Sequence, residues 1–333
     1  MKVLFLLKSD KTPSSRIRGL DLLPGLREKG FEADAEIVPS SFWRRRSLFR
    51  KCRGYEVTVL QKRLLSIFDF HMLRRNARKL VFDFDDAIYL RNASCSPDPA
   101  DYASPTRMGK FKRTVCGSDL VIAANKVLAA KAGEICPKVP VRIIPSAVAV
   151  ADKVKKDYTL SSPPVIGWVG TKSTLRYLGL VSEAFSELRS RRDFILRVIS
   201  DEPYMQSGIN VEFVRWSLSA QEDGLCGFDI GIMPLSRDPF SEGKSAYKLL
   251  QYLAAGVPSV CSPVGMNADV AGFGEYCLTA SDSRSFCRQM EKLLDDPELR
   301  RSFGRRGRRM IEEKYSVGVV AANLAEALSE IHR

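Results

Sequence analysis

The chain has 333 residues, of which 45% are hydrophobic and 27% charged, a composition that suits two ordinary domains better than one. It has no apolar run near the roughly 20 residues that a membrane-spanning helix needs, and the apolar start at 1–8 is too short for a signal peptide, so we expect a cytoplasmic protein. No two of the eight cysteines have C-x-x-C spacing and there are only two histidines, which argues against a structural zinc site.

The positive charge is confined to one half of the chain. Residues 1–150 hold 28 Lys and Arg against 15 Asp and Glu, a difference of +13, whereas residues 151–333 hold 24 of each. This asymmetry indicates an anionic partner for the N-terminal half, namely a membrane surface, a lipid phosphate or a nucleic acid. The alternative is a surface that only keeps the protein in solution.

The N-terminal half alternates β-branched, apolar segments with helical ones. A helix is predicted over residues 20–30, closed by Gly30, and Pro24 requires either a kink or a late start in it. Such alternation favours a doubly wound parallel sheet. The predicted strands are 3–7, 36–39, 55–61, 80–86, 120–124 and 141–145.

Residues 151–164 are polar and rich in Pro and Ser, as expected of a linker, and the pattern then restarts. We predict an N-terminal domain over 1–152, a C-terminal domain over 163–309, and a C-terminal helix over 310–333 that packs back towards the first domain. Both domains are predicted to be α/β and Rossmann-like, with ligands bound at the carboxyl ends of the strands in a cleft that the domains face. The second domain's predicted strands are 165–170, 194–200, 211–214, 229–234 and 258–262, and its predicted helices are 175–189, 247–255 and one from 297 onwards.

Two segments are candidates for phosphate binding. The turn Gly170-Thr171-Lys172 follows a predicted strand and leads into a helix, where free N–H groups and a lysine suit a diphosphate, although a purely structural turn fits as well. The segment 241–258 is more specific, because its glycine and serine leave the backbone open where a helix begins. Lys248 and Gln251 lie one turn apart on that helix and share a face.

The second segment also carries a resemblance to a known family. The chain resembles the retaining glycosyltransferases of family 4, the group 1 type, in segments 229–235, 243–258, 262–267 and 294–299. The resemblance implies a GT-B fold, a hexosyltransferase-like activity, a UDP- or GDP-sugar as donor, and no essential metal or other cofactor. Its acceptor is expected to be a glycan or a lipid-linked precursor in polysaccharide biosynthesis. The donor-binding residues it implies, with Trp216 added after a predicted strand, are Gly170, Thr171, Lys172, Trp216, Gly243, Lys244, Ser245, Ala246, Tyr247, Lys248 and Gln251.

The chain departs from the family at three positions. The family carries two glutamates in the 243–258 segment, and these positions are Gly243 and Gln251 here, with Glu242 one residue out of register. A family histidine after the fourth strand corresponds to Asp85. These departures leave open two alternatives to a glycosyltransferase: a nucleotide-sugar binding protein without activity, and a sugar-nucleotide epimerase.

The acidic end of the fourth predicted strand is the candidate catalytic region. Strand alternation would put Asp83 and Asp85 on one face and Asp86 on the other. Asp85 or Asp86 could bond an acceptor hydroxyl or act as a base, and the alternatives are a divalent metal, a helix cap or a structural salt bridge. We name Asp85, Asp86 and Lys244 as the candidate catalytic residues.

Basic residues supply the remaining candidates. Arg16 and Arg18 are placed in the first loop after a strand, where they could bind a phosphate of donor or acceptor, a surface pair being the alternative. Residues 42–53 interleave aromatic residues with six cations, which suits an anionic membrane surface and predicts peripheral association with the inner membrane face. No nucleic-acid motif accompanies this charge, so no nucleic-acid partner is predicted.

Overall fold

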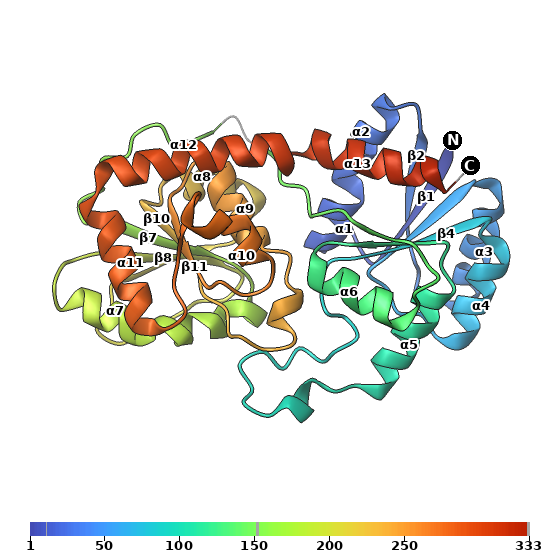
Figure 1. Ribbon diagram of the computed structural model, residues 1–333, viewed down its shortest axis with the longest axis horizontal. Helices are drawn as coiled ribbons and strands as arrows, with labels where there is room; N and C mark the ends of the chain where they lie inside the picture. Colours follow the sequence, from blue (N-terminus) through green and yellow to red (C-terminus); the bar gives the residue numbers. More distant parts are fainter. Residues whose placement is uncertain (11, 151–152, 332–333) are drawn as a thin grey trace. The chain divides into compact units, whose positions relative to one another are not determined.

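The computed structural model describes residues 1–10, 12–150 and 153–331, which form two compact units (Figure 1). The first unit comprises residues 1–147, 242–245 and 315–333, and the second comprises residues 148–241 and 246–314. The predicted boundary at 152 and the last two residues of the predicted C-terminal segment lie outside the described residues.

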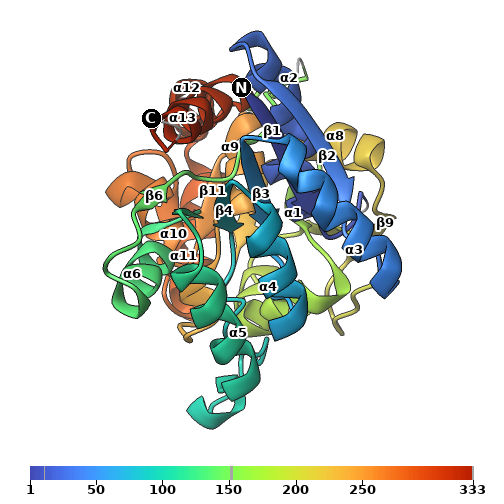
Figure 2. The ribbon, with the colours of Figure 1, turned by 90° about the vertical axis from the view of Figure 1, so that its right-hand side faces the viewer.

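The first unit is built on a six-stranded parallel sheet in the order β2-β1-β3-β4-β5-β6 (Figures 1 and 2). The chain winds from β1 outwards to β2 and then returns to β3, so the winding reverses between β1 and β3. In open α/β sheets, the carboxyl edge at such a reversal is where ligands bind. The strands are β1 (Lys2–Leu7), β2 (Glu32–Ile37), β3 (Val57–Gln61), β4 (Lys79–Phe84), β5 (Leu120–Ala123) and β6 (Val141–Ile143).

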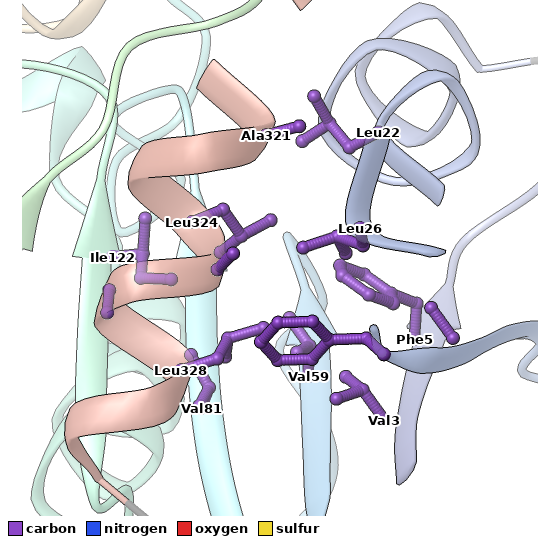
Figure 3. Close-up of a cluster of buried hydrophobic side chains, with 14 of the residues drawn as sticks. Val3, Phe5, Leu22, Leu26, Val59, Val81, Ile122, Ala321, Leu324 and Leu328 are labelled. Carbon is purple, nitrogen blue, oxygen red and sulfur yellow. The ribbon is translucent and has the colours of Figure 1, made fainter. Parts of the chain in front are cut away.

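Helices cover this sheet, and the last helix of the chain joins its core. Ala321, Leu324 and Leu328 of α13 pack among side chains of α2 and the central strands (Figure 3). Burial of these large apolar side chains is the main stabilising contribution of the contact. The helices are α1 (Pro13–Arg18), η1 (Leu20–Leu22), α2 (Leu23–Glu28), α3 (Phe42–Lys51), η2 (Cys52–Gly54), α4 (Ile67–Asn76), η3 (Pro99–Tyr102), α5 (Pro105–Cys116), α6 (Lys126–Ile135) and α13 (Val317–Glu330).

The second unit has its own six-stranded parallel sheet in the order β12-β11-β10-β7-β8-β9, with the winding reversed between β7 and β10. Its strands are β7 (Val165–Val169), β8 (Ile195–Ser200), β9 (Val211–Arg215), β10 (Ile230–Met233), β11 (Ser259–Cys261) and β12 (Leu278–Thr279). Its helices are η4 (Lys172–Val181), α7 (Ser182–Arg189), α8 (Leu218–Cys226), η5 (Ser241–Gly243, at the unit boundary), α9 (Tyr247–Ala254), α10 (Met266–Ala271), η6 (Gly272–Gly274), α11 (Ser283–Asp295) and α12 (Pro297–Lys314).

The predicted pair of doubly wound parallel sheets is confirmed, with three local corrections. β2 spans residues 32–37, not 36–39, because an edge strand that alternates acids with alanines lacks the apolar run used to find strands. Pro24 lies in the first turn of α2, so the late start is confirmed. Residues 172–181 are 3₁₀ helix, and β12, two residues long, was not predicted. No helix in the described part of the chain is long and apolar enough to cross a bilayer.

Candidate functional site

At the carboxyl edge of the second sheet, one tyrosine hydrogen-bonds to both of the neighbouring strands β7 and β10. The hydroxyl of Tyr252, on α9, accepts the N–H of Val169 at 3.0 Å and donates to the carbonyl of Ile232 at 3.2 Å. Val169 belongs to β7 and Ile232 to β10. Helix α9 is therefore fixed against the reversal point, where an open α/β sheet binds its ligand.

The predicted turn after β7 lies against the same helix. A side chain at Gly170 would place its Cβ 2.2 Å from the ring of Trp168, so close packing requires glycine there. The ammonium of Lys248 lies 5.3 Å from the centroid of that ring, within cation–π range. The φ of Gly170 is not in the left-handed region, so the need for glycine at this position comes from the Trp168 ring and not from the backbone conformation.

The backbone N–H groups of this turn already have acceptors. The N–H of Lys172 donates to the carboxylate of Asp201 at 2.5 Å, and the N–H of Thr171 donates to the hydroxyl of Thr174 at 3.1 Å. The ammonium of Lys172 lies 3.4 Å from Glu202. The carboxylate of Asp201 thus accepts a backbone N–H that the sequence predicts to bind a phosphate. A diphosphate bound to this N–H group would have to displace Asp201.

Trp216 follows β9 at the same carboxyl edge. Its indole N–H donates to Gln221 at 3.0 Å, and its side chain is 38% exposed. The hydrogen bond restrains the ring orientation while part of the residue stays exposed.

Helix α9 begins from an unusual backbone conformation. Ala246, which precedes it, has φ +53°, the left-handed region, and its methyl group cannot cap the helix. A non-glycine residue there is strained by about 1–3 kcal/mol, and such strain gathers at functional sites. The preceding loop is held by Asp238, whose carboxylate accepts the N–H groups of Phe240 and Ser241 at 2.9 and 2.8 Å. Gln251 lies in the second turn of the same helix and is buried.

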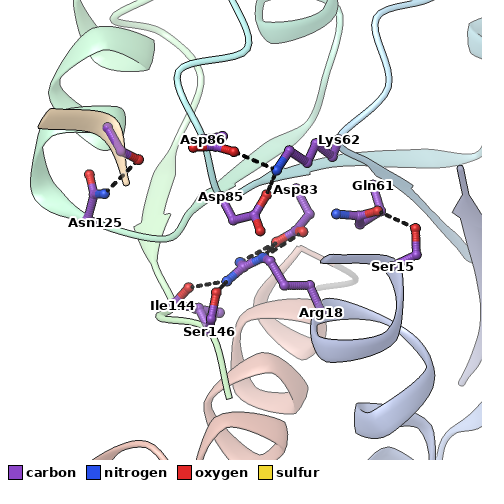
Figure 4. A network of polar contacts seen from close by, with 11 residues as sticks. Ser15, Arg18, Gln61, Lys62, Asp83, Asp85, Asp86, Asn125, Ile144 and Ser146 are labelled. Atoms are coloured by element: carbon purple, nitrogen blue, oxygen red, sulfur yellow. Dashed lines mark hydrogen bonds and ion pairs between the residues drawn. The ribbon is translucent and has the colours of Figure 1, made fainter. Parts of the chain in front are cut away.

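Gly243 lies in the part of this segment that belongs to the first unit. The side-chain amide of Asn125, at the start of α6, donates to the carbonyls of Gly243 and Lys244 at 3.2 and 3.1 Å (Figure 4). A Cβ at Gly243 would lie 2.8 Å from the Cβ of Ala87 and 3.1 Å from Leu128. The glutamate that the family carries here therefore does not fit, which explains the departure seen in the sequence.

Arg18 and Asp83 form a buried ion pair in the first unit. The Arg18 guanidinium meets the Asp83 carboxylate at 2.5 to 3.1 Å through two nitrogens, and it also donates to the carbonyl of Ile144 at 3.0 Å (Figure 4). Both residues are 4% exposed. The predicted placement of Arg18 in an open loop is corrected: it ends helix α1, and its charge is matched by Asp83. Arg16 lies on the same helix, half-buried, 3.7 Å from Asp21.

Asp85 and Asp86 share one cation, Lys62. Its ammonium lies 2.8 Å from Asp85 and 2.9 Å from Asp86 (Figure 4). Burial opposes the charge of Lys62, but the two carboxylates outweigh that cost and raise its pKa. The expectation that Asp86 faces away from Asp85 is wrong, because β4 ends at Phe84 and alternation stops there.

Lys62 and Gln61 were missed by the sequence prediction. Both follow from the parallel register, since Gln61 pairs with Asp83 and the next residue along β3 therefore comes beside the acidic end of β4. Gln61 is fully buried beside the winding reversal, where its carbonyl oxygen accepts from Ser15 at 3.2 Å. Its amide nitrogen has no hydrogen-bond partner among the described residues.

The acidic residues after β4 were one candidate for a divalent metal site in the sequence. Across residues 1–10, 12–150 and 153–331, no cluster of three or more His, Cys, Asp or Glu side chains is placed to hold a metal ion. The carboxylates of Asp83, Asp85 and Asp86 are instead matched by Arg18 and Lys62.

Comparison with known proteins gives matches to a family and to solved folds. Residues 163–296 match the family described as glycosyl transferases group 1, and no curated protein sequence is significantly similar to the chain. Sucrose-phosphate synthase from Thermosynechococcus elongatus is similar at 14% identity and TM-score 0.76, over 99% of this chain and 98% of that one. Anabaena HepE, solved with UDP and glucose, is similar at 13% identity and TM-score 0.75, over 99% and 100%. A trehalose-6-phosphate protein from E. coli, bound with UDP-2-fluoro glucose, has 11% identity and TM-score 0.71, over 100% and 99%.

Likeness at these identities establishes the fold, which is that of the GT-B proteins: two doubly wound parallel sheets, each with its reversal point. Residues 163–296, about two fifths of the chain, are similar to the group 1 glycosyl transferases, and the predicted GT-B fold is confirmed.

Proposed function

We propose that the protein is a retaining glycosyltransferase that takes a UDP- or GDP-sugar as donor and transfers its sugar to a hydroxyl of a glycan or lipid-linked precursor. The observation that carries the donor assignment is the Tyr252 hydroxyl, which fixes α9 to both strands at the reversal point of the second sheet. Solved proteins of the same fold have been described with UDP and glucose or with UDP-glucose.

The donor's diphosphate is proposed to contact the turn Gly170–Lys172 and the start of α9. Lys172, Lys244 and Lys248 are the cations proposed to contact it, in a half of the chain whose net charge is zero. In a retaining reaction of this kind, the protein orients the donor and stabilises the departing diphosphate with N–H groups and cations. The proposed nucleotide contacts are Trp216, whose ring stacks on the base, and Gln251, whose neutral amide bonds a ribose hydroxyl.

Asp85 and Asp86 are proposed to serve the acceptor. Lys62 fixes both side chains in place through ion pairs of 2.8 Å to Asp85 and 2.9 Å to Asp86. A carboxylate so held accepts a hydrogen bond from an acceptor hydroxyl and orients it for attack. The unpartnered amide nitrogen of Gln61 offers a further donor at the reversal point of the same sheet.

The test is turnover of a panel of nucleotide-sugars, preceded by a thermal-shift screen in which a bound donor stabilises the protein by RT ln(1 + [L]/Kd). We expect Lys244→Ala and Lys248→Ala each to reduce transfer by one to three orders of magnitude, as loss of a group that stabilises transition-state charge does. The exposed Lys292→Ala is the matched control and should leave turnover unchanged. Intact turnover in both site variants would show that the donor site is elsewhere.

One observation favours a second function, binding without turnover. Ala87 and Leu128 leave no space for a glutamate at position 243, so a family residue is absent for a structural reason. Calorimetric binding of a nucleotide-sugar, together with neither transfer nor donor hydrolysis across the panel, would establish this alternative.

A further inference from the structure

The first unit carries a groove between helices α3 and α4, away from the residues discussed so far. Its volume is about 690 Å³, and its lining includes Phe42, Arg46, Arg50, Ile67, Phe68 and Arg75. The two helices lie side by side (Figures 1 and 2), joined by an ion pair of 3.1 Å between Arg45 and Asp69. We call this surface the α3–α4 groove.

The arginines of the α3–α4 groove form one helical face. Phe42, Arg46, Arg50 and Arg53 recur at spacings of four, four and three, which places them in a line along α3 and the turn after it. Arg75 faces them from α4, and no carboxylate lines the groove. The groove is therefore a strip of positive charge.

These cations are available to a partner. Two neighbouring cations are matched within the chain, Arg45 by Asp69 and Lys51 by Glu36 at 2.6 Å. For Arg46, Arg50, Arg53 and Arg75, no ion pair occurs with any residue that the structure describes. These four arginines therefore contribute to the positive charge excess of this half of the chain without being matched inside it.

Large apolar side chains are gathered at one end of the groove. Phe42 and Trp43 in the first turn of α3 are 48% and 71% exposed, and Ile67 and Phe68 in the first turn of α4 are 48% and 80% exposed. Arg46 lies 5.9 Å from the centroid of the Trp43 ring. Exposed apolar residues are ordinary when scattered, but a cluster rimmed by cations marks an interaction site.

The apolar end lies at the carboxyl edge of the first sheet. Helix α3 begins five residues after β2 ends, and α4 begins six residues after β3 ends, so both start at that edge. Lys62, which follows β3, and Asp85, which follows β4, lie at the same edge. A surface that receives the apolar end therefore lies on the same side of the sheet as the proposed acceptor carboxylates.

We propose that the α3–α4 groove docks the first unit on an anionic phospholipid bilayer. The arginines bind headgroup phosphates, and Trp43, Ile67 and Phe68 enter the boundary between headgroups and acyl chains. A bilayer is favoured over a nucleic acid because Ile67 cannot stack on a base, and because the apolar groups form one tip at the helix ends instead of alternating with the cations. The inference rests on the proposed function in one respect only: a bilayer is where the protein would meet a lipid-linked acceptor.

The experiment is flotation of the purified full chain with vesicles of phosphatidylglycerol and phosphatidylcholine, compared with vesicles of phosphatidylcholine alone. We expect binding to the anionic vesicles that weakens as salt is raised. Each cation at such a surface contributes about fivefold in affinity, so Arg46→Gln, Arg50→Gln and Arg53→Gln combined should weaken binding about a hundredfold. The matched control removes three exposed arginines of the second unit, Arg284→Gln, Arg288→Gln and Arg305→Gln, and should bind as the unaltered chain does.

A second measurement does not depend on the folding of the arginine variant. Lipids brominated in their acyl chains should quench the fluorescence of the unaltered chain, and Trp43→Phe should lose that quenching. Three results would each overturn the proposal. They are equal binding to neutral and anionic vesicles, an equal loss of binding in the control variant, and unchanged quenching in Trp43→Phe.

Binding of single-stranded RNA at near-physiological salt without vesicle binding would overturn it in favour of a nucleic acid. The thermal shift with nucleotide-sugars is measured on the same variants, so a failed docking surface and a failed donor site are told apart.

Discussion

The ammonium of Lys62 bridges the two acids that follow β4, at 2.8 Å from Asp85 and 2.9 Å from Asp86. The side chains of Lys62 and Asp85 are 21% and 10% exposed, so water screens this contact only in part. Lys62 itself has a left-handed backbone, φ +48°, which indicates that the position is imposed by its surroundings. The arrangement makes Lys62 the positioning residue for the proposed acceptor carboxylates.

Replacing Lys62 by methionine should cost about 2 kcal/mol of stability, because two carboxylates lose the cation that matches them in a half-buried site. Since the folded-state pKa of Lys62 is raised, its contribution is full below the unfolded value of about 10.4 and is lost as pH rises through the folded pKa. Denaturant unfolding should therefore show a constant difference in stability between the variant and the unaltered chain from pH 7 to about pH 10, and a difference that begins to narrow only above that. Lys62→Arg should keep most of the stability, and the exposed Lys112→Met should show no such pH dependence.

Restoring the family's glutamate at position 243 should harm the protein. Gly243→Glu places a Cβ 2.8 Å from that of Ala87, and overpacking of this kind costs about 1–3 kcal/mol. We expect a lower Tm and lower transfer. Gln251→Glu is the matched change, because it restores the family's other glutamate. Glutamate and glutamine have almost the same shape, so this variant should fold. A Gly243→Glu variant with unaltered Tm and raised turnover would contradict the packing described here.

The sequence was sufficient for the fold because strand and helix signals alternate twice, with a polar segment rich in Pro and Ser between them. It was also sufficient to propose a donor segment, since 243–258 combines a helix start, cations and a terminating Gly-x-Pro within 16 residues. It was insufficient for side-chain partners that depend on strand order. Arg18 meets Asp83 across 65 residues because β1, β3 and β4 are neighbours in the sheet, and no local pattern encodes that.

The Arg18–Asp83 pair should behave as a structural unit. Arg18→Met leaves a carboxylate buried without its cation, and we expect a loss of about 3–5 kcal/mol. Arg18→Met combined with Asp83→Leu should recover part of that loss, because both charges are removed together. A double-mutant cycle by denaturant unfolding measures the coupling. Donor affinity of the stably folded double variant should be unchanged; a large rise in donor Kd would restore Arg18 to the phosphate-binding role predicted from the sequence.

Asp201 should compete with the donor. Its carboxylate accepts the N–H of Lys172 at 2.5 Å, in the turn that we propose for the diphosphate. Asp201→Asn keeps an acceptor oxygen and removes the negative charge, so the Kd for a nucleotide-sugar should fall about three- to tenfold, an effect of about 1 kcal/mol. Calorimetry at low and high salt checks this, since the gain should shrink as salt screens the charge. Asp223→Asn removes an exposed acid of α8 and should leave the Kd unchanged.

Trp216 should carry much of the affinity for the base. Its ring is fixed by the hydrogen bond to Gln221 and remains 38% exposed, so little order has to be gained when a base stacks on it. Stacking of a base on an aromatic side chain contributes about 1–3 kcal/mol, so Trp216→Ala should raise the Kd for the whole donor and for the free nucleoside diphosphate about 5- to 150-fold alike. Trp216→Phe should recover most of the affinity, whereas Leu218→Ala, a loss of another exposed apolar side chain two residues on, should change little. If Trp216→Ala weakens binding of the sugar-bearing donor but not of the nucleoside diphosphate, the ring contacts the sugar and the proposed orientation of the donor is reversed.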